Sequence, residues 1–95
     1  MNSLLNRFKT PKEIQQIIAK NVRDRRKAMN FTQEEFAKKC GVSFGSYKRF
    51  ENKAEISLEG LVKIGYVLGC QEEMMNLFVR KEYSSIEEVI HERNS

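Results

Sequence analysis

The stretch F-T-Q-E-E-F-A-K-K-C-G-V-S-F-G-S-Y-K-R-F-E, residues 31–51, decides the fold of this 95-residue chain. Its first half begins with the signals of a helix start. Thr32 is an N-cap residue, whose hydroxyl can accept a hydrogen bond from a free backbone N–H of the first turn. Glu35, three residues later, completes a capping box, and Phe31 and Phe36 occupy the two positions of a hydrophobic staple. We therefore predict a short helix that begins directly after Thr32.

A break that contains glycine separates this helix, expected over residues 33–39, from a second one. Gly41 is the left-handed residue expected after a helix end. Ser43 is the N-cap of the second helix, which we expect over residues 44–52. Two helices joined by a break of about 3–4 residues that includes Gly form the pattern of a DNA-binding helix-turn-helix.

Further short motifs flank the two helices in a fixed order. They are Arg26, Thr32-Gln33-Glu34-Glu35-Phe36-Ala37, Gly41-Val42-Ser43, Tyr47, Glu51-Asn52, Ile56-Ser57-Leu58 and Leu68-Gly69. Over about residues 12–80 this set resembles the XRE/Cro-type helix-turn-helix regulators, which include phage repressors and HipB-like antitoxins. The variant S-F-G-S-Y-K-R-F-E followed by E-I-S-L is most similar to the HipB-like branch. The resemblance implies an all-α fold, a compact five-helix phage-repressor-like domain.

The helix before this stretch is also well marked. Thr10 is its cap, Pro11 takes the first helical position and Glu13 closes a capping box. We expect this helix over residues 11–28. Apolar residues at roughly 3.6-residue spacing mark one face of this helix. They are Ile14, Ile17, Ile18, Val22 and Met29.

Two more helices complete the expected domain. Ser57 caps a fourth helix that ends before Gly69, and a fifth is expected over about residues 71–80. The predicted organisation is an N-terminal arm over residues 1–10, a helix-turn-helix domain over 11–80, and a C-terminal tail with a short helix over 81–95.

The resemblance assigns a structural role to Arg26. In the family an Arg at this position pairs with a Glu at the end of the reading helix, here Glu51. We expect a partly buried structural ion pair between them. The neighbouring Arg25 and Lys27 have two interpretations, either contact with the negative end of the helix dipole or contact with a DNA phosphate.

The charge of the chain is unevenly divided. Residues 1–53 hold 13 Lys/Arg and 5 Asp/Glu, whereas residues 54–95 hold 4 Lys/Arg and 8 Asp/Glu. A basic half joined to an acidic half indicates a polyanionic partner on one side of the molecule only.

The second helix of the motif is the expected reading element, because its N-terminal residues meet base edges in the major groove. Arg49 is the candidate for a bidentate contact with guanine, and Phe44 for contact with a thymine methyl. Lys48 is expected on a phosphate. Gly45 offers no side chain but allows close approach, so part of the specificity is expected from DNA shape. The predicted DNA-binding residues are Gln33, which faces a phosphate in the family, Ser43, Phe44, Gly45, Ser46, Lys48, Arg49 and Lys53.

The fifth helix carries an apolar cluster with two interpretations. It closes the core, or it forms a dimer or partner surface, to which flexible Met is suited. The cluster consists of Met74, Met75, Leu77 and Phe78. A smaller apolar stripe in the tail is expected to pack on the domain, or to dock a partner protein or the second subunit. Its members are Ile86, Val89 and Ile90.

These features predict sequence-specific binding of double-stranded DNA by a transcriptional regulator, a dimeric repressor. The alternative is an antitoxin or adaptor that mainly binds a partner protein, a toxin, with DNA binding for autoregulation. We expect no enzyme and no cofactor, since Cys40, Cys70 and His91 form no nucleophile–base pattern and no metal spacing. No apolar run approaches the ~20 residues that cross a bilayer, so we expect no membrane partner. Cys40 and Cys70 show no disulfide pattern, which fits a reducing cytoplasm as the expected location.

Overall fold

A computed structural model describes residues 9–80 of the chain. Within this part the fold is all-helical, as predicted. The predicted tail over 81–95, and the predicted arm up to residue 8, lie outside the described residues. The helices are α2 (Pro11–Ala28), α3 (Gln33–Cys40), α4 (Phe44–Lys53), α5 (Leu58–Val67) and α6 (Gln71–Met75).

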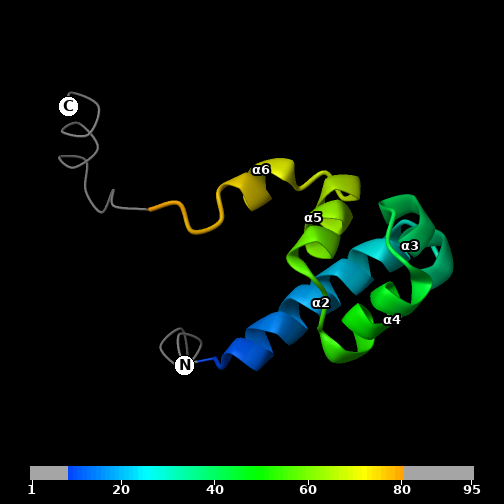
Figure 1. Cartoon of the computed structure of the whole chain (residues 1–95), viewed down its shortest axis with the longest axis horizontal. Coiled ribbons are helices and arrows are strands. Elements are labelled where there is room, and N and C mark those ends of the chain that lie inside the picture. Colours follow the sequence, from blue (N-terminus) through cyan, green and yellow to red (C-terminus); the bar gives the residue numbers. More distant parts are fainter. Residues whose placement is uncertain (1–8, 81–95) are drawn as a thin grey trace.

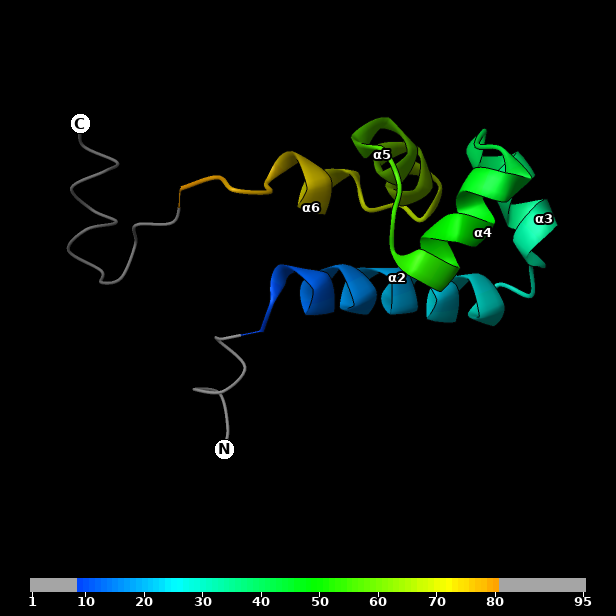
Figure 2. The same cartoon turned by 60° about the horizontal axis from the view of Figure 1, so that its bottom comes forward.

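The long helix α2 forms the base on which the other helices are arranged (Figure 1). Helix α4 packs on α2 and on α3, and α5 packs on α3. Helix α6 packs on α5 and leads back toward the amino end of α2, away from α3 and α4 (Figure 2). No helix in residues 9–80 is long and apolar enough to cross a membrane.

The predicted caps set the helix boundaries. The Thr10 hydroxyl accepts from the backbone N–H of Glu13 at 3.1 Å, and the Glu13 carboxylate accepts from the backbone N–H of Thr10 at 2.8 Å. Thr32 and Glu35 form the same reciprocal pair of hydrogen bonds at the start of α3. Gly41 takes the left-handed conformation, with φ 76°, where α3 ends. Both capping boxes and the glycine stop are therefore confirmed.

An aromatic stack joins α3 to α4 in the core. The Phe36 ring meets the Tyr47 ring edge-on with centroids 5.4 Å apart, and Tyr47 lies 6.1 Å from Phe50. Phe36 and Tyr47 are fully buried, so each contributes the full hydrophobic gain of an aromatic side chain. The other buried apolar residues are Ala19, Val22, Ala37, Cys40, Ala54, Ile64 and Leu68.

Arg25 has a role that neither sequence interpretation included. Its Nη2 donates to the Leu68 carbonyl at 2.8 Å, and its Nη1 donates to Cys70 Sγ at 3.3 Å. Carbonyls at a helix end lack an intrahelical partner. Arg25 therefore fastens the carboxyl end of α5 to α2.

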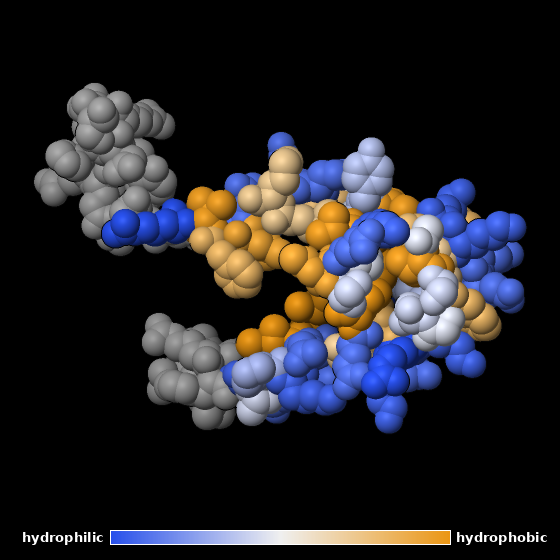
Figure 3. Space-filling view, viewed as in Figure 1, coloured by the Kyte–Doolittle hydropathy of each residue, from blue (hydrophilic) through white to orange (hydrophobic). Residues whose placement is uncertain are grey.

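The predicted extent of the fifth expected helix was wrong, and the apolar face of α2 is only partly covered. Ile14, Ile17 and Ile18 remain between 39% and 49% exposed, because α6 does not cover them. Helix α6 ends at Met75 instead of continuing to residue 80. A short helix needs a packed apolar face to persist, and Phe78, 98% exposed, has no such contact. The result is an apolar notch between the first half of α2 and α6 (Figure 3).

Candidate nucleic-acid interface

The Glu51 carboxylate, in the last turns of α4, is the centre of a hydrogen-bond network. Arg26 donates to it twice, from Nε to Oε2 at 2.8 Å and from Nη2 to Oε1 at 3.1 Å. Gln33 Nε2 donates to Oε1 at 2.8 Å, and the Tyr47 hydroxyl donates to Oε2. The side chain of Glu51 is 2% exposed and that of Arg26 is 9% exposed. One buried carboxylate thus joins α2, α3 and α4.

The guanidinium of Arg26 is engaged on both sides. In addition to the two contacts with Glu51, its Nη1 donates to the Phe31 carbonyl at 2.6 Å. The same side chain therefore holds the turn between α2 and α3 and the end of α4. This arrangement fixes the angle at which α4 lies on α2.

The network favours the ionised forms of Arg26 and Glu51. Burial raises the pKa of Glu51, but hydrogen bonds from Arg26, Tyr47 and Gln33 outweigh burial and leave that pKa below its ordinary value. The hydrogen bond to Glu51 raises the pKa of Arg26. Burial, together with the hydrogen bond to Glu51, raises the pKa of the Tyr47 phenol. Glu51 is therefore an anion and Tyr47 a neutral donor at neutral pH.

The lowered pKa of Glu51 predicts a loss of stability in acid. The unfolded chain takes up a proton at Glu51 near pH 4.5, whereas the folded protein resists protonation until a lower pH. The ionised carboxylate thus stabilises the fold above about pH 4.5, and this contribution is lost as the pH falls through the folded pKa. A ¹³C NMR titration of the Glu51 carboxyl group should give a pKa below 4.5. A higher measured value would contradict the network.

The exposed face of α4 carries most of the predicted DNA contacts. Tyr47 and Phe50 face the core, and the residues between and before them face solvent. Of the predicted DNA-binding set, Gln33 is half-buried and all others are exposed. These exposed residues are Ser43, Phe44, Gly45, Ser46, Lys48, Arg49 and Lys53.

The beginning of α4 is fixed by its cap. The Ser43 hydroxyl accepts from the backbone N–H of Ser46 at 3.1 Å. One turn further, Lys48 Nζ lies 5.3 Å from the centroid of the Phe44 ring, a cation–π contact. The ring and the ammonium group therefore form one amphipathic patch next to the cap.

The Gln33 side chain forms a hydrogen bond within the protein that the sequence did not indicate. Its Nε2 contributes one N–H to Glu51. An amide has a second N–H and an acceptor oxygen, so the hydrogen bond to Glu51 does not exhaust the side chain. The bond also holds the first residue of α3 beside α4.

Glu55 is the residue of this region that the sequence interpretation missed. Arg49 Nε donates to Glu55 Oε1 at 2.9 Å, and Arg49 Nη2 lies 2.7 Å from the same oxygen. The loop reaches this position because Ala54 adopts the left-handed conformation, with φ 59°. A spacing of six residues across a loop gives no periodic signal, so this pair could not be read from the sequence.

Neither a metal-binding cluster nor a disulfide occurs among residues 9–80. No three side chains of His, Cys, Asp or Glu gather in this part of the chain to hold a metal ion. Cys40 and Cys70 are free. Burial raises the pKa of Cys40 to about 11, which keeps it a thiol at neutral pH and a poor nucleophile.

Two capped helices around a glycine turn, with an exposed basic face on the second, define a helix-turn-helix DNA-binding domain. The family model of the helix-turn-helix proteins matches residues 22–74, more than half of the chain. The chain therefore belongs to this family, as an XRE/Cro-type regulator. This is a fold of DNA-binding transcription regulators and not of enzymes. Neither the curated proteins nor the solved structures gave a match to this chain.

Proposed function

We propose that the protein is a dimeric, sequence-specific repressor that acts in the cytoplasm on double-stranded DNA. The observation that carries the proposal is the exposed basic face of α4, held on α2 and α3 by the buried Glu51 network. Because that network fixes the angle of α4, the exposed face of this helix has a fixed orientation relative to α2 and α3. The repressor role rests on the resemblance to phage repressors.

The exposed side chains of α4 divide into base contacts and phosphate contacts. Arg49 takes guanine O6 and N7, and Phe44 lies against a thymine methyl. Lys48 and Lys53 contact phosphates as point charges. Ser46 bonds a base or a phosphate. At the start of α3, the second amide N–H of Gln33 and the free backbone N–H groups bind another phosphate, and Ser43 stays mainly a cap.

Gly45 supports a close approach between the α4 backbone and the DNA. A Cβ at this position would have no heavy atom within 4 Å. We expect Gly45→Ala to raise the free energy of unfolding by about 0.5–1 kcal/mol, since Ala is the better helix residue. The same variant should bind DNA more weakly. Urea unfolding will measure the change in stability, and DNA titration will measure the change in affinity.

Gly60→Ala is the matched control for Gly45→Ala. Gly60 is buried, and a Cβ there would lie 2.8 Å from Ile56 Cγ1. This variant should lose stability through overpacking. A Gly45→Ala protein that is stabilised and binds DNA at least as tightly as wild type would contradict the close approach.

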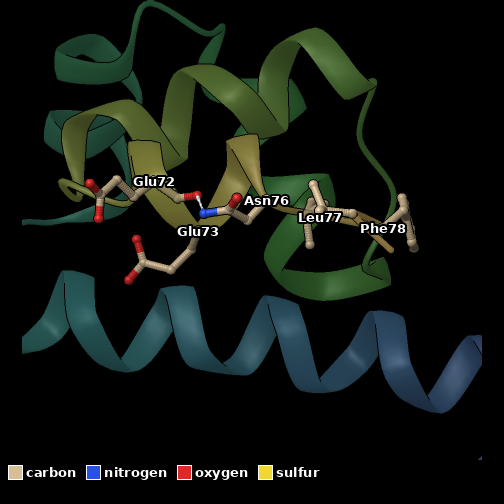
Figure 4. A pocket seen from close by; sticks show the side chains of 6 residues that line it. Glu72, Glu73, Asn76, Leu77 and Phe78 are labelled. Carbon is tan, nitrogen blue, oxygen red and sulfur yellow. Dashed lines mark hydrogen bonds between the residues drawn. The ribbon is translucent and has the colours of Figure 1, made fainter. Parts of the chain in front are cut away.

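The dimer is proposed to form through the surface around α6. Met75, Leu77 and Phe78 are largely exposed, whereas Met74 lies over Gly65 of α5. Figure 4 shows five of the six residues that line a pocket here, with Glu72 and Glu73 on one side of Asn76 and Leu77 and Phe78 on the other. Val79 is the sixth. A two-fold dimer would place two copies of α4 in major grooves about 34 Å apart, or a multiple of that distance.

A second candidate function is supported by the same surface. An exposed apolar cluster beside carboxylates also fits a basic protein partner, such as the toxin of an antitoxin pair. Sedimentation separates the two candidates. If Phe78→Ser abolishes a wild-type dimer and Leu58→Ser does not, the α6 surface serves self-association. If wild type is monomeric, the partner-binding function is favoured.

The test of DNA binding is fluorescence anisotropy on two duplexes at two salt concentrations. One duplex comes from the region upstream of the protein's own gene, and the other is its shuffled sequence. We expect a strong preference for the first duplex and a steep salt dependence. Each neutralised phosphate contributes about −0.9 to the slope of the logarithm of the binding constant against the logarithm of the salt concentration. Weak and equal binding to both would contradict the repressor proposal.

A further inference from the structure

The loop after α4 brings a carboxylate onto the proposed base-reading arginine. Both contacts of Arg49 with Glu55, at 2.9 Å and 2.7 Å, use Nε and Nη2, and both end on the single oxygen Oε1. Nε and Nη2 form one edge of the planar guanidinium. The contacts use neither Nη1 nor the second N–H of Nη2, which together form the outer edge. That outer edge has the geometry of a bidentate donor.

The backbone that carries Glu55 is anchored on both sides. The buried Ala54 donates from its backbone N–H to the Phe50 carbonyl at 2.8 Å. The Ala54 carbonyl in turn accepts from Gln15 Nε2 of α2 at 3.0 Å. The loop therefore starts against α2 (Figure 2). Glu55 is thus presented from a fixed backbone.

The pair between Arg49 and Glu55 is a poor candidate for a folding role. The two side chains are 66% and 46% exposed. Ion pairs in such exposed positions contribute little to stability, because water screens the charges and two long side chains must be ordered. A carboxylate beside a DNA-reading face also repels phosphates, so the free energy of general DNA binding is less favourable with Glu55 present.

We propose that Glu55 is a positioning residue for sequence reading, which holds the Arg49 guanidinium with its outer edge free for guanine. The inference rests on the function proposed above. Glu55 then has two opposite effects on DNA binding. It lowers affinity for every sequence by repulsion, and it raises discrimination by restricting the directions in which Arg49 donates.

The variant that tests this inference is Glu55→Gln, which keeps the size of the side chain and removes its charge. The probes are the duplex that the wild-type protein selects from a randomised library and a shuffled duplex of the same composition. Glu55→Gln should bind the shuffled duplex more tightly than wild type does. Its ratio of the two affinities should fall by about two- to fivefold, the range set by an exposed ion pair. Library selection repeated with the variant should show a relaxed guanine preference.

Asp24→Asn is the matched control, since it removes one carboxylate from another exposed ion pair, Lys20–Asp24 at 2.8 Å. It should leave the affinity ratio unchanged. An unchanged or larger ratio for Glu55→Gln overturns the inference, and so does an equal loss of affinity for both duplexes. If the wild-type protein itself shows no preference in the selection, the proposed function fails together with the inference. If the wild-type protein prefers the selected duplex and Glu55→Gln keeps that preference in full, the inference fails while the proposed function stands.

Discussion

Arg26→Ala should lower the free energy of unfolding by about 3–5 kcal/mol, since removing one partner of a buried ion pair leaves the other uncompensated. In the variant the Glu51 carboxylate, whose side chain is 2% exposed, would keep only the hydrogen bonds from Gln33 and Tyr47. It would also leave the Phe31 carbonyl without its 2.6 Å donor. Thermal unfolding followed by circular dichroism should show a midpoint lowered by more than about 10 °C.

Lys20→Ala is the control for this experiment. Lys20 Nζ forms an ion pair with Asp24 Oδ2 on the same helix at 2.8 Å, but both side chains are more than half exposed. Its midpoint should stay within about 2 °C of wild type, because exposed pairs contribute little. An Arg26→Ala midpoint as close to wild type as that of Lys20→Ala would show that the Glu51 network does not hold α4.

Arg49→Ala should relax discrimination at one base position by ~1–3 kcal/mol, the value of a good bidentate contact with guanine. Lys48→Ala should instead weaken binding to all sequences about equally and reduce the salt slope by about 1. The difference follows from chemistry, since the guanidinium is a directional fork and the ammonium group a point charge. Affinities for every single-base variant of the selected duplex will measure both effects.

Arg49→Lys is the matched variant for Arg49→Ala. It keeps the positive charge and loses the fork, so general affinity should be retained and guanine discrimination lost. Equal losses on specific and shuffled DNA for the Arg49 and Lys48 variants would contradict the division between base and phosphate contacts.

Much of the fold could be predicted because its signals are local. The capping boxes at Thr10 and Thr32 act within one helical turn, and the left-handed stop at Gly41 depends on a single residue. Helix α2 over Pro11–Ala28 was predicted to the residue for this reason. The ion pair between Arg26 and Glu51 is long-range, and it was expected only through the resemblance to a family.

The features that escaped prediction depend on where the chain goes between helices. Glu55 reaches Arg49 because Ala54, a residue with no particular preference for the left-handed conformation, adopts it. The exposure of Ile14 and the early end of α6 have one cause: the apolar residues after Met75 do not pack back onto α2. Periodicity indicates which face of a helix is apolar, but not whether another element covers it.

The claim that α4 reads base edges in the major groove can be tested most directly with 7-deazaguanine. This base keeps Watson–Crick pairing and replaces the N7 acceptor by a C–H group. Placed at the guanine that the selected duplex requires, it should lower the affinity of the wild-type protein about tenfold or more, the effect of losing a hydrogen bond to a charged group. It should not change the affinity of Arg49→Ala. Unchanged wild-type affinity at every guanine, or an equal loss in Arg49→Ala, would contradict the account.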